Sequence, residues 1–210
     1  MTIMIENKKF FGFADHDYKE IVTLSVEGKI KWFEYRFNKI IIRPIEDIMK
    51  IVAKEQKKPQ GAKLLEDEDV SIFTIVVLAI CVGIDLLGGF LDGTKGDTNR
   101  KTFKNFVTQF LDPQKEYLKT PYEGAHTYAT FLYMKFRCGL AHNLTIKEVG
   151  FTYGEKYFVK GDGFYYVSVD RLFKDLKRGL EQYLSELSRN KSNLKRNFND
   201  RFEHIFIRKK

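Results

Sequence analysis

Hydrophobic residues recur at helical spacing through much of this chain of 210 residues. In each such segment the apolar positions repeat every three or four residues, which is the period of one face of an α-helix. This pattern predicts helices over residues 45–58, 70–91, 100–111, 125–140, 170–187 and 194–207. We therefore expect a mainly α protein, α+β overall.

Two regions show the period of β structure instead. Residues 21–26 and 30–37 are β-branched and aromatic runs, and Glu27-Gly28-Lys29 between them resembles a turn, so we predict a small N-terminal antiparallel sheet. Short β runs also occupy residues 148–169, where Gly161-Asp162-Gly163 predicts a hairpin turn.

The break after the first predicted helix suggests a division of the chain. Lys57-Lys58-Pro59-Gln60-Gly61 cannot continue a helix and is the best domain boundary. We predict a small β-rich module with one helix over residues 1–60, a helical domain over 61–190, and a basic helix or tail over 191–210.

The run from Val70 to Leu91 is the most hydrophobic part of the chain, and Asp85 is its only charge. At this length a membrane span is one alternative. The glycines of the run and the lack of an adjacent positive cluster favour a helix buried in a core or a dimer interface, so we expect no membrane. A buried Asp85 needs a cation as partner, and Arg137 is a candidate for that role.

Charge is concentrated at the C-terminus. The net charge is +8, and residues 189–210 hold eight Lys and Arg against two acids. A basic tail suits a polyanionic partner such as nucleic acid, although a solvated basic helix is an equal alternative. Four cations are the candidates for contact with RNA phosphates, namely Arg100, Lys104, Lys195 and Arg196.

The spacing of the two cysteines argues against a zinc site. Cys81 and Cys138 have neither a CxxC spacing nor a histidine at ligand spacing, so we expect no zinc site and no other metal or cofactor. Isolated thiols in apolar helices are typical of a reducing cytoplasm, and the apolar stretch at the N-terminus is too short for a signal peptide.

The segment from Phe136 to Asn143 carries the candidate chemistry. Arg137 offers a permanent cation with donors that fit phosphate, and His142 can exchange protons near neutral pH. Five positions along an ideal α-helix correspond to a rotation of about 140°, so the two side chains would not share a face unless the helix loosens or a second copy completes the site. The structural alternative for His142 is a helix C-cap, with Asn143 in the left-handed position that follows.

This segment resembles the signature of the HEPN superfamily, a group of helical ribonuclease-like domains in which four to six residues separate an Arg from a His at a helix end. The context is similar over residues 66–190: a long apolar helix with an acidic residue, the Arg- and Phe-rich segment 99–107, and a Tyr-rich helix leading into Arg137 and His142. Cys138 stands where active members often have a polar residue.

The resemblance implies an HEPN-like helical bundle with a β-hairpin insertion that forms a homodimer and cleaves RNA without a metal. His142 would act as general acid or base, and Arg137 would stabilise charge on the phosphate, with Asp85 and Asn143 as supporting residues. The products would be a 2′,3′-cyclic phosphate and a 5′-hydroxyl. Many members are toxins, some with a cognate antitoxin, or act in phage defence. Others are non-catalytic modules for dimerisation or for nucleotide or protein binding, which is the alternative function.

Overall fold

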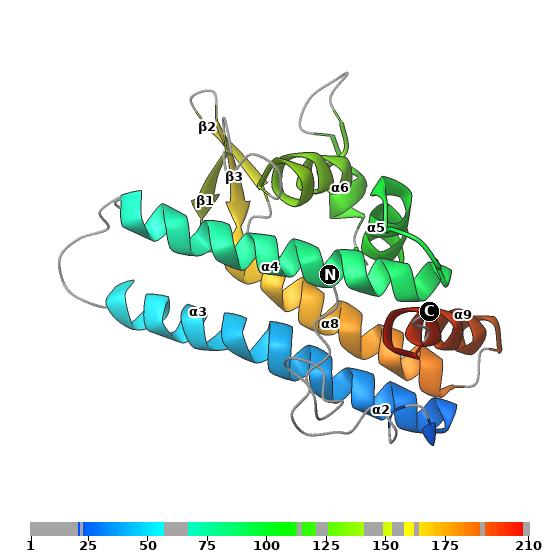
Figure 1. Cartoon of the computed structure of the whole chain (residues 1–210). Coiled ribbons are helices and arrows are strands. Elements are labelled where there is room, and N and C mark those ends of the chain that lie inside the picture. The colour runs from blue at the N-terminus through cyan, green and yellow to red at the C-terminus, as the bar shows by residue number, and fades with distance from the viewer. Residues whose placement is uncertain are drawn as a thin grey trace.

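The computed structural model describes residues 21, 23–56, 67–112, 115–120, 126–140, 149–152, 158–161, 164–189 and 192–207. These residues are mostly helical, as the hydrophobic spacing predicted. In Figure 1 the helix α4 (Asp67–Asp92) runs through the centre, with α2 (Val26–Phe37) and α3 (Arg43–Gln56) below it. Above α4 lie α5 (Arg100–Phe106) and α6 (Tyr128–Phe131), and α8 (Val169–Ser188) runs alongside.

The prediction of an antiparallel sheet over residues 21–26 and 30–37 is wrong, because residues 21 and 23 are helical, Val26 begins α2, and residues 30–37 lie within α2. Ser25 caps the helix, and its hydroxyl accepts a hydrogen bond from the Gly28 amide, so the apparent turn at 27–29 is the first helical turn. Ile30, Phe33 and Phe37 are buried at helical spacing. The aromatic residues of this segment favour β structure by local preference, but their packing against the core decides for a helix. Residues 1–20 of the predicted β-rich module lie outside the described residues.

The predicted helix over 45–58 is present as α3, but it continues from α2 without a break through the π-helical segment Asn38–Ile42. Pro44 explains this wider winding. A proline inside a helix lacks an amide hydrogen, and its ring clashes with the carbonyl four residues earlier, which is that of Ile40. Widening the preceding turn relieves the clash and lets one helix span both segments.

The core is built around α4. Val76, Ile80, Ile84 and Leu87 are fully buried. By length and composition, Ile72–Asp92 passes as a membrane span, and 61% of its most apolar window is buried inside the bundle. Residues before and after the predicted boundary at 60 share this core, which is formed mainly by the rings and aliphatic side chains of α2, α4, α5, α8 and α9 (Ser192–Phe202).

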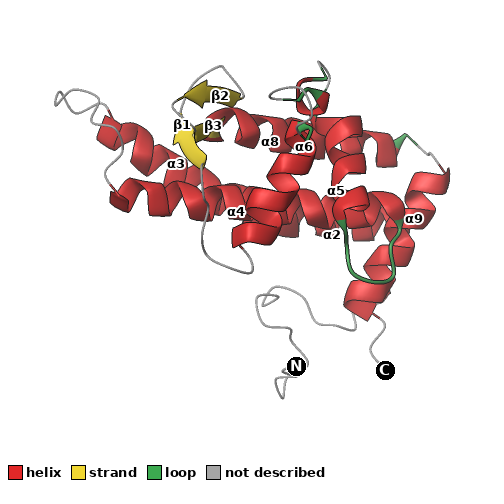
Figure 2. Ribbon diagram, turned by 90° about the horizontal axis from the view of Figure 1, so that it is seen from above, coloured by secondary structure: helices red, strands yellow, loops and turns green. Residues whose placement is uncertain are grey.

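The predicted hairpin is confirmed by β2 (Phe158–Gly161) and β3 (Phe164–Ser168), which pair antiparallel with Gly161 opposite Phe164. A third strand, β1 (Val149–Thr152), pairs parallel with β3, so the sheet order is β1-β3-β2. Figure 2 shows the sheet toward one end of the helical bundle and α9 toward the other. The sheet is therefore an appendage to a mainly α fold.

The remaining elements place the C-terminus against α4. The π-helical segments Val107–Leu111, Leu132–Leu140 and Glu203–Ile207 extend α5, α6 and α9, and a short 3-10 helix covers Glu116–Leu118. The Asn197 amide of α9 donates to the Leu91 carbonyl at 2.8 Å. Gly93 ends α4 with a φ of +66°, and a Cβ there would lie 2.9 Å from the Asn197 Cα. The predicted helix at 194–207 is confirmed and packs over the end of α4.

Candidate functional site

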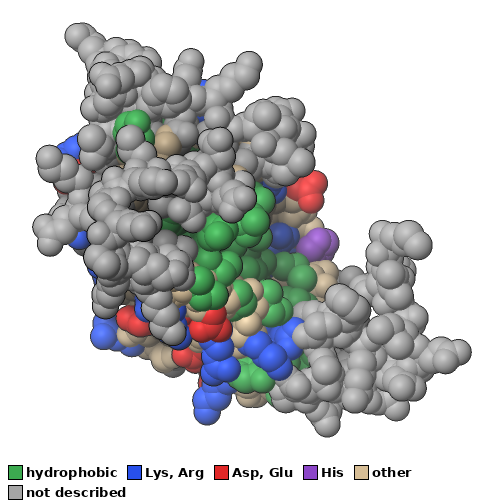
Figure 3. Space-filling model, turned by 90° about the vertical axis from the view of Figure 1, so that its left-hand side faces the viewer, with side chains coloured by type: hydrophobic (Ala, Val, Ile, Leu, Met, Phe, Trp, Pro, Cys, Tyr) green, Lys and Arg blue, Asp and Glu red, His purple; other side chains and the backbone are tan. Residues whose placement is uncertain are grey.

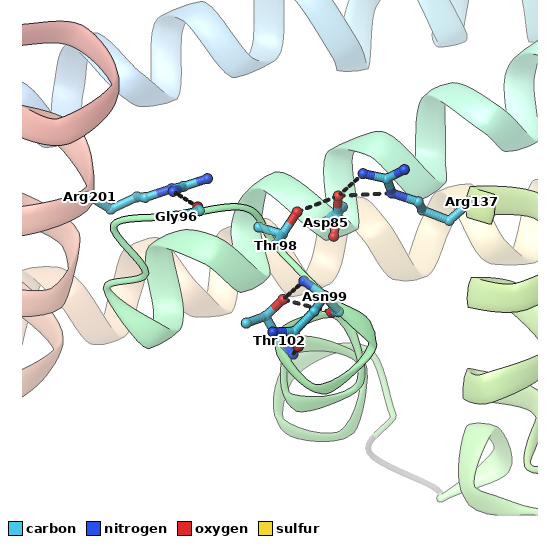
Figure 4. Close-up of polar contacts among 7 residues, drawn as sticks. All are labelled: Asp85, Gly96, Thr98, Asn99, Thr102, Arg137 and Arg201. Atoms are coloured by element: carbon cyan, nitrogen blue, oxygen red, sulfur yellow. Dashed lines mark hydrogen bonds and ion pairs between the residues drawn. The ribbon is translucent and has the colours of Figure 1, made fainter. Parts of the chain in front are cut away.

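An ion pair between Asp85 and Arg137 forms the centre of the site (Figure 4). Asp85 lies in α4 with 9% of its side chain exposed, and Arg137 lies in the segment Leu132–Leu140 with 29% exposed. The Arg137 Nε donates to the Asp85 Oδ2 at 3.1 Å, and Nη2 lies 3.0 Å from the same oxygen. The pairing expected for the single charge of the apolar run is confirmed.

Thr98 adds a third contact to the same oxygen. Its hydroxyl donates to the Asp85 Oδ2 at 2.6 Å. Thr98 immediately precedes Asn99, which caps α5. The Asn99 side-chain oxygen accepts a hydrogen bond from the Thr102 amide, and the Thr102 hydroxyl accepts one from the Asn99 amide, so the two residues form a capping box at the start of α5. The local sequence therefore fixes the helix start that holds Thr98 beside Asp85.

Arg201 of α9 approaches the same region from the opposite side (Figure 4). Its side chain is buried, and Nη1 donates to the carbonyls of Thr94 and Gly96 at 2.6 Å each. These two carbonyls belong to the loop between α4 and α5, which also carries Thr98. Two arginines and one carboxylate thus lie around one loop.

Burial and pairing act on the titratable groups in opposite directions. Burial by itself lowers the pKa of Arg137, but the charge of Asp85 and its hydrogen bonds raise the pKa above its ordinary value. Burial lowers the pKa of Arg201, and the charge of Asp85 partly opposes this. Burial raises the pKa of Cys81, so this thiol stays protonated. The cluster therefore offers fixed positive charge and a carboxylate that orients it.

The winding around Arg137 is looser than that of an α-helix. Residues Leu132–Leu140 are π-helical, with hydrogen bonds between residues five apart. Arg137 and a residue five positions later can share a face of the helix only if the helix loosens or a second copy completes the site, and this winding meets the first condition. His142 and Asn143 themselves lie outside the described residues, so their roles stay predictions.

The candidate RNA-binding cations divide between two helices that both pack against α4. Arg100 begins α5, two residues after Thr98, and its side chain is exposed, whereas Lys104 is half-buried. On α9, Arg196 is exposed and the Lys195 ammonium lies 2.9 Å from the Glu27 carboxylate. Lys195 is therefore already paired, while Arg100 and Arg196 are accessible.

Sequence reasoning missed Thr98 and Arg201. Thr98 had a local signal, because it directly precedes a residue suited to cap a helix. Arg201 had no local signal beyond the general basic charge of the tail. Its role depends on a loop more than a hundred positions away in the sequence, at Thr94 and Gly96.

Metal centres and ligand pockets are two other kinds of functional site. Within the described ranges, no group of three or more His, Cys, Asp or Glu side chains is placed to hold a metal ion. Two surface hollows of about 550 and 490 Å³ are lined by other residues, the first between the end of α4 and α9 and the second beside α2 and α3.

Comparison of the chain with protein-family models, with curated proteins and with solved structures found no match. The function must therefore be argued from the site itself.

Proposed function

We propose that the protein is a metal-independent endoribonuclease of the HEPN type. The observation that carries this proposal is the Arg137 guanidinium, which Asp85 holds by Nε and Nη2 immediately before the segment that contains His142. A fixed, partly exposed guanidinium, followed five positions later in the sequence by a titratable imidazole, supplies much of what phosphodiester cleavage needs in the absence of a metal.

The roles of the two residues follow from their chemistry. Arg137 stabilises the negative charge that grows on the phosphate oxygens as the ribose 2′-oxygen attacks phosphorus. The reaction moves two protons, one away from the 2′-hydroxyl and one onto the departing 5′-oxygen; His142 carries out one of these transfers as general base or acid, and solvent water carries out the other. The bond from phosphorus to the 5′-oxygen breaks as the new bond forms, which leaves a 2′,3′-cyclic phosphate and a 5′-hydroxyl.

The proposal includes a homodimer, and the surface of α4 supports it. Ile72, Ile75 and Val82 are 37%, 59% and 46% exposed, and the half-buried Ala79 and Leu86 complete a spacing of three and four residues. This is the spacing of a seam that packs against another helix. Figure 3 shows hydrophobic side chains gathered on one face of the molecule, with charged side chains along part of their border.

The test is RNA cleavage in EDTA by the purified wild type, Arg137→Ala, His142→Ala and Arg43→Ala. Arg43 is an exposed arginine at the start of α3 and serves as the matched control. We expect cleavage by the wild type and the control only.

A non-catalytic binding module is the second candidate, because both Nε and Nη2 of Arg137 already face Asp85 and only part of the guanidinium is exposed. Equal background cleavage in all four proteins would favour this candidate over the ribonuclease.

A further inference from the structure

The C-terminal helix reaches the site through a buried arginine. Arg201 is 8% exposed and lies on α9, far from Asp85 in the sequence. Asn197, one turn earlier, binds the Leu91 carbonyl at 2.8 Å and fixes α9 over the end of α4. Arg201 therefore projects from a helix that is itself anchored, which limits how far its guanidinium can move.

The loop between α4 and α5 is held between this arginine and Asp85. Arg201 Nη1 binds the carbonyls of Thr94 and Gly96 at 2.6 Å each. Thr98, two residues after Gly96, donates to the Asp85 Oδ2 at 2.6 Å. A charged donor makes stronger hydrogen bonds than a neutral one, so these two bonds give the loop a defined path.

Gly89 allows this arrangement to lie directly on α4. A Cβ at this position would be 2.8 Å from the Thr98 Cγ2 and 3.2 Å from the Arg201 Nε. Any larger residue would therefore push both side chains outward from α4. The glycine lies one helical turn after Asp85, so the packing of loop and arginine is close to the carboxylate that holds Arg137.

We propose that Arg201 is a positioning residue of the site: through the loop that carries Thr98, it fixes the Asp85 carboxylate and hence the guanidinium of Arg137. Three sets of hydrogen bonds connect the two arginines: Arg201 donates to the carbonyls of Thr94 and Gly96, Thr98 donates to Asp85, and Arg137 donates to the same Asp85 oxygen. The kinetic part of this inference rests on the proposed ribonuclease function. The structural part does not.

Burial separates this role from direct contact with RNA. Arg201 is 8% exposed, and its Nη1 donates hydrogen bonds to two loop carbonyls. The Arg137 side chain is 29% exposed. A phosphate can approach Arg137 without moving the chain, but it would have to displace the loop to reach Nη1 of Arg201. Loss of Arg201 should thus change the rate of the chemical step more than the binding of RNA.

The experiment compares Arg201→Met, Arg201→Lys, Thr98→Val and the double variant Arg201→Met/Thr98→Val, with Arg43→Met as the control. The first readout is kcat and KM for RNA cleavage. The second is the NMR signal of the Arg137 Nε–H, assigned by its loss in Arg137→Lys, which reports the hydrogen bond to Asp85 whether or not the protein cleaves RNA.

We expect Arg201→Met and Thr98→Val each to lower kcat by about tenfold to a hundredfold with little change in KM, because misplaced catalytic groups cost rates of this order. Arg201→Lys, which retains a charged donor, recovers part of the loss. The double variant loses little beyond either single variant, since both act through one contact. The Arg137 Nε–H signal shifts and exchanges faster in both single variants, and it is unchanged in Arg43→Met.

Several results would overturn the inference. Additive losses in the double variant, or a raised KM with unchanged kcat, would mean that Arg201 contacts RNA itself. An unchanged Arg137 Nε–H signal in folded Arg201→Met would refute the positioning role even if no RNA is cleaved. Absence of cleavage by the wild type together with the expected NMR shifts would refute the ribonuclease proposal and leave the positioning role intact.

Discussion

The Asp85–Arg137 pair predicts an asymmetry between its two single variants. The Asp85 side chain is 9% exposed and the Arg137 side chain is 29% exposed. Arg137→Met leaves a buried carboxylate that still accepts the hydrogen bond from the Thr98 hydroxyl but has lost its paired cation, and breaking a buried pair in this way costs about 3–5 kcal/mol. Asp85→Asn keeps an oxygen acceptor, and the more exposed arginine can regain water, so we expect a cost of only about 1–2 kcal/mol.

The double variant makes the prediction sharper. Replacing both charged partners with apolar side chains of similar volume removes the desolvation cost along with the attraction. Because replacing both partners is near neutral whereas breaking the pair is costly, we expect Asp85→Leu/Arg137→Met to be more stable than Arg137→Met alone by about 3–5 kcal/mol.

The assay is urea unfolding followed by circular dichroism, at one fixed protein concentration because dimer formation would contribute to apparent stability. An Asp85→Asn variant as unstable as Arg137→Met would refute the argument from unequal burial. A double variant less stable than either single variant would refute the account of the buried carboxylate.

Three further predictions concern other parts of the molecule. Burial raises the pKa of Tyr183 far above its ordinary value of about 10. Above about pH 10 the unfolded chain therefore releases a proton that the folded chain keeps, and the free energy of unfolding falls by about 1.4 kcal/mol per pH unit. In alkaline urea titrations this fall should be smaller for Tyr183→Phe. If the proposed dimer forms through α4, light scattering should find monomers for Ile75→Glu and Val82→Glu and a dimer for Ile51→Glu, at a site 61% exposed on α3; a dimer in all three would exclude the α4 seam. Arg196→Glu should weaken RNA binding and flatten its dependence on salt, and an unchanged slope would show that this cation contacts no phosphate.

The helical core could be predicted because it follows from local hydrophobic spacing, whereas for the partner of Asp85 the sequence offered only a candidate. The hydrophobic run has more than twenty residues, and Asp85 is its single charge, so burial of the run requires a cation beside that carboxylate. Arg137, from the segment that carries the candidate chemistry, was the candidate for that cation. The apolar spacing of α5 and α8 was equally direct, since the predicted faces are buried.

The errors and omissions have physical causes of another kind. The segment 30–37 is rich in aromatic and β-branched residues, yet Ile30, Phe33 and Phe37 bury one helical face against the core, so tertiary packing outweighed local preference. The role of Arg201 depends on a loop brought to α9 by the fold, and no local pattern records such a contact. The role of His142 stays a prediction from the motif.

The most direct test of the proposed function uses one RNA oligonucleotide in two forms. The first is all ribose, and the second carries a single 2′-deoxy nucleotide at the cleavage site mapped with the first. Our account predicts that the wild type in EDTA cleaves only the all-ribose form, that the product ends in a 2′,3′-cyclic phosphate by mass spectrometry, and that His142→Ala cleaves neither. Equal cleavage of both forms, or cleavage that persists in His142→Ala, would contradict the central claim that Arg137 and His142 promote attack by the ribose 2′-oxygen.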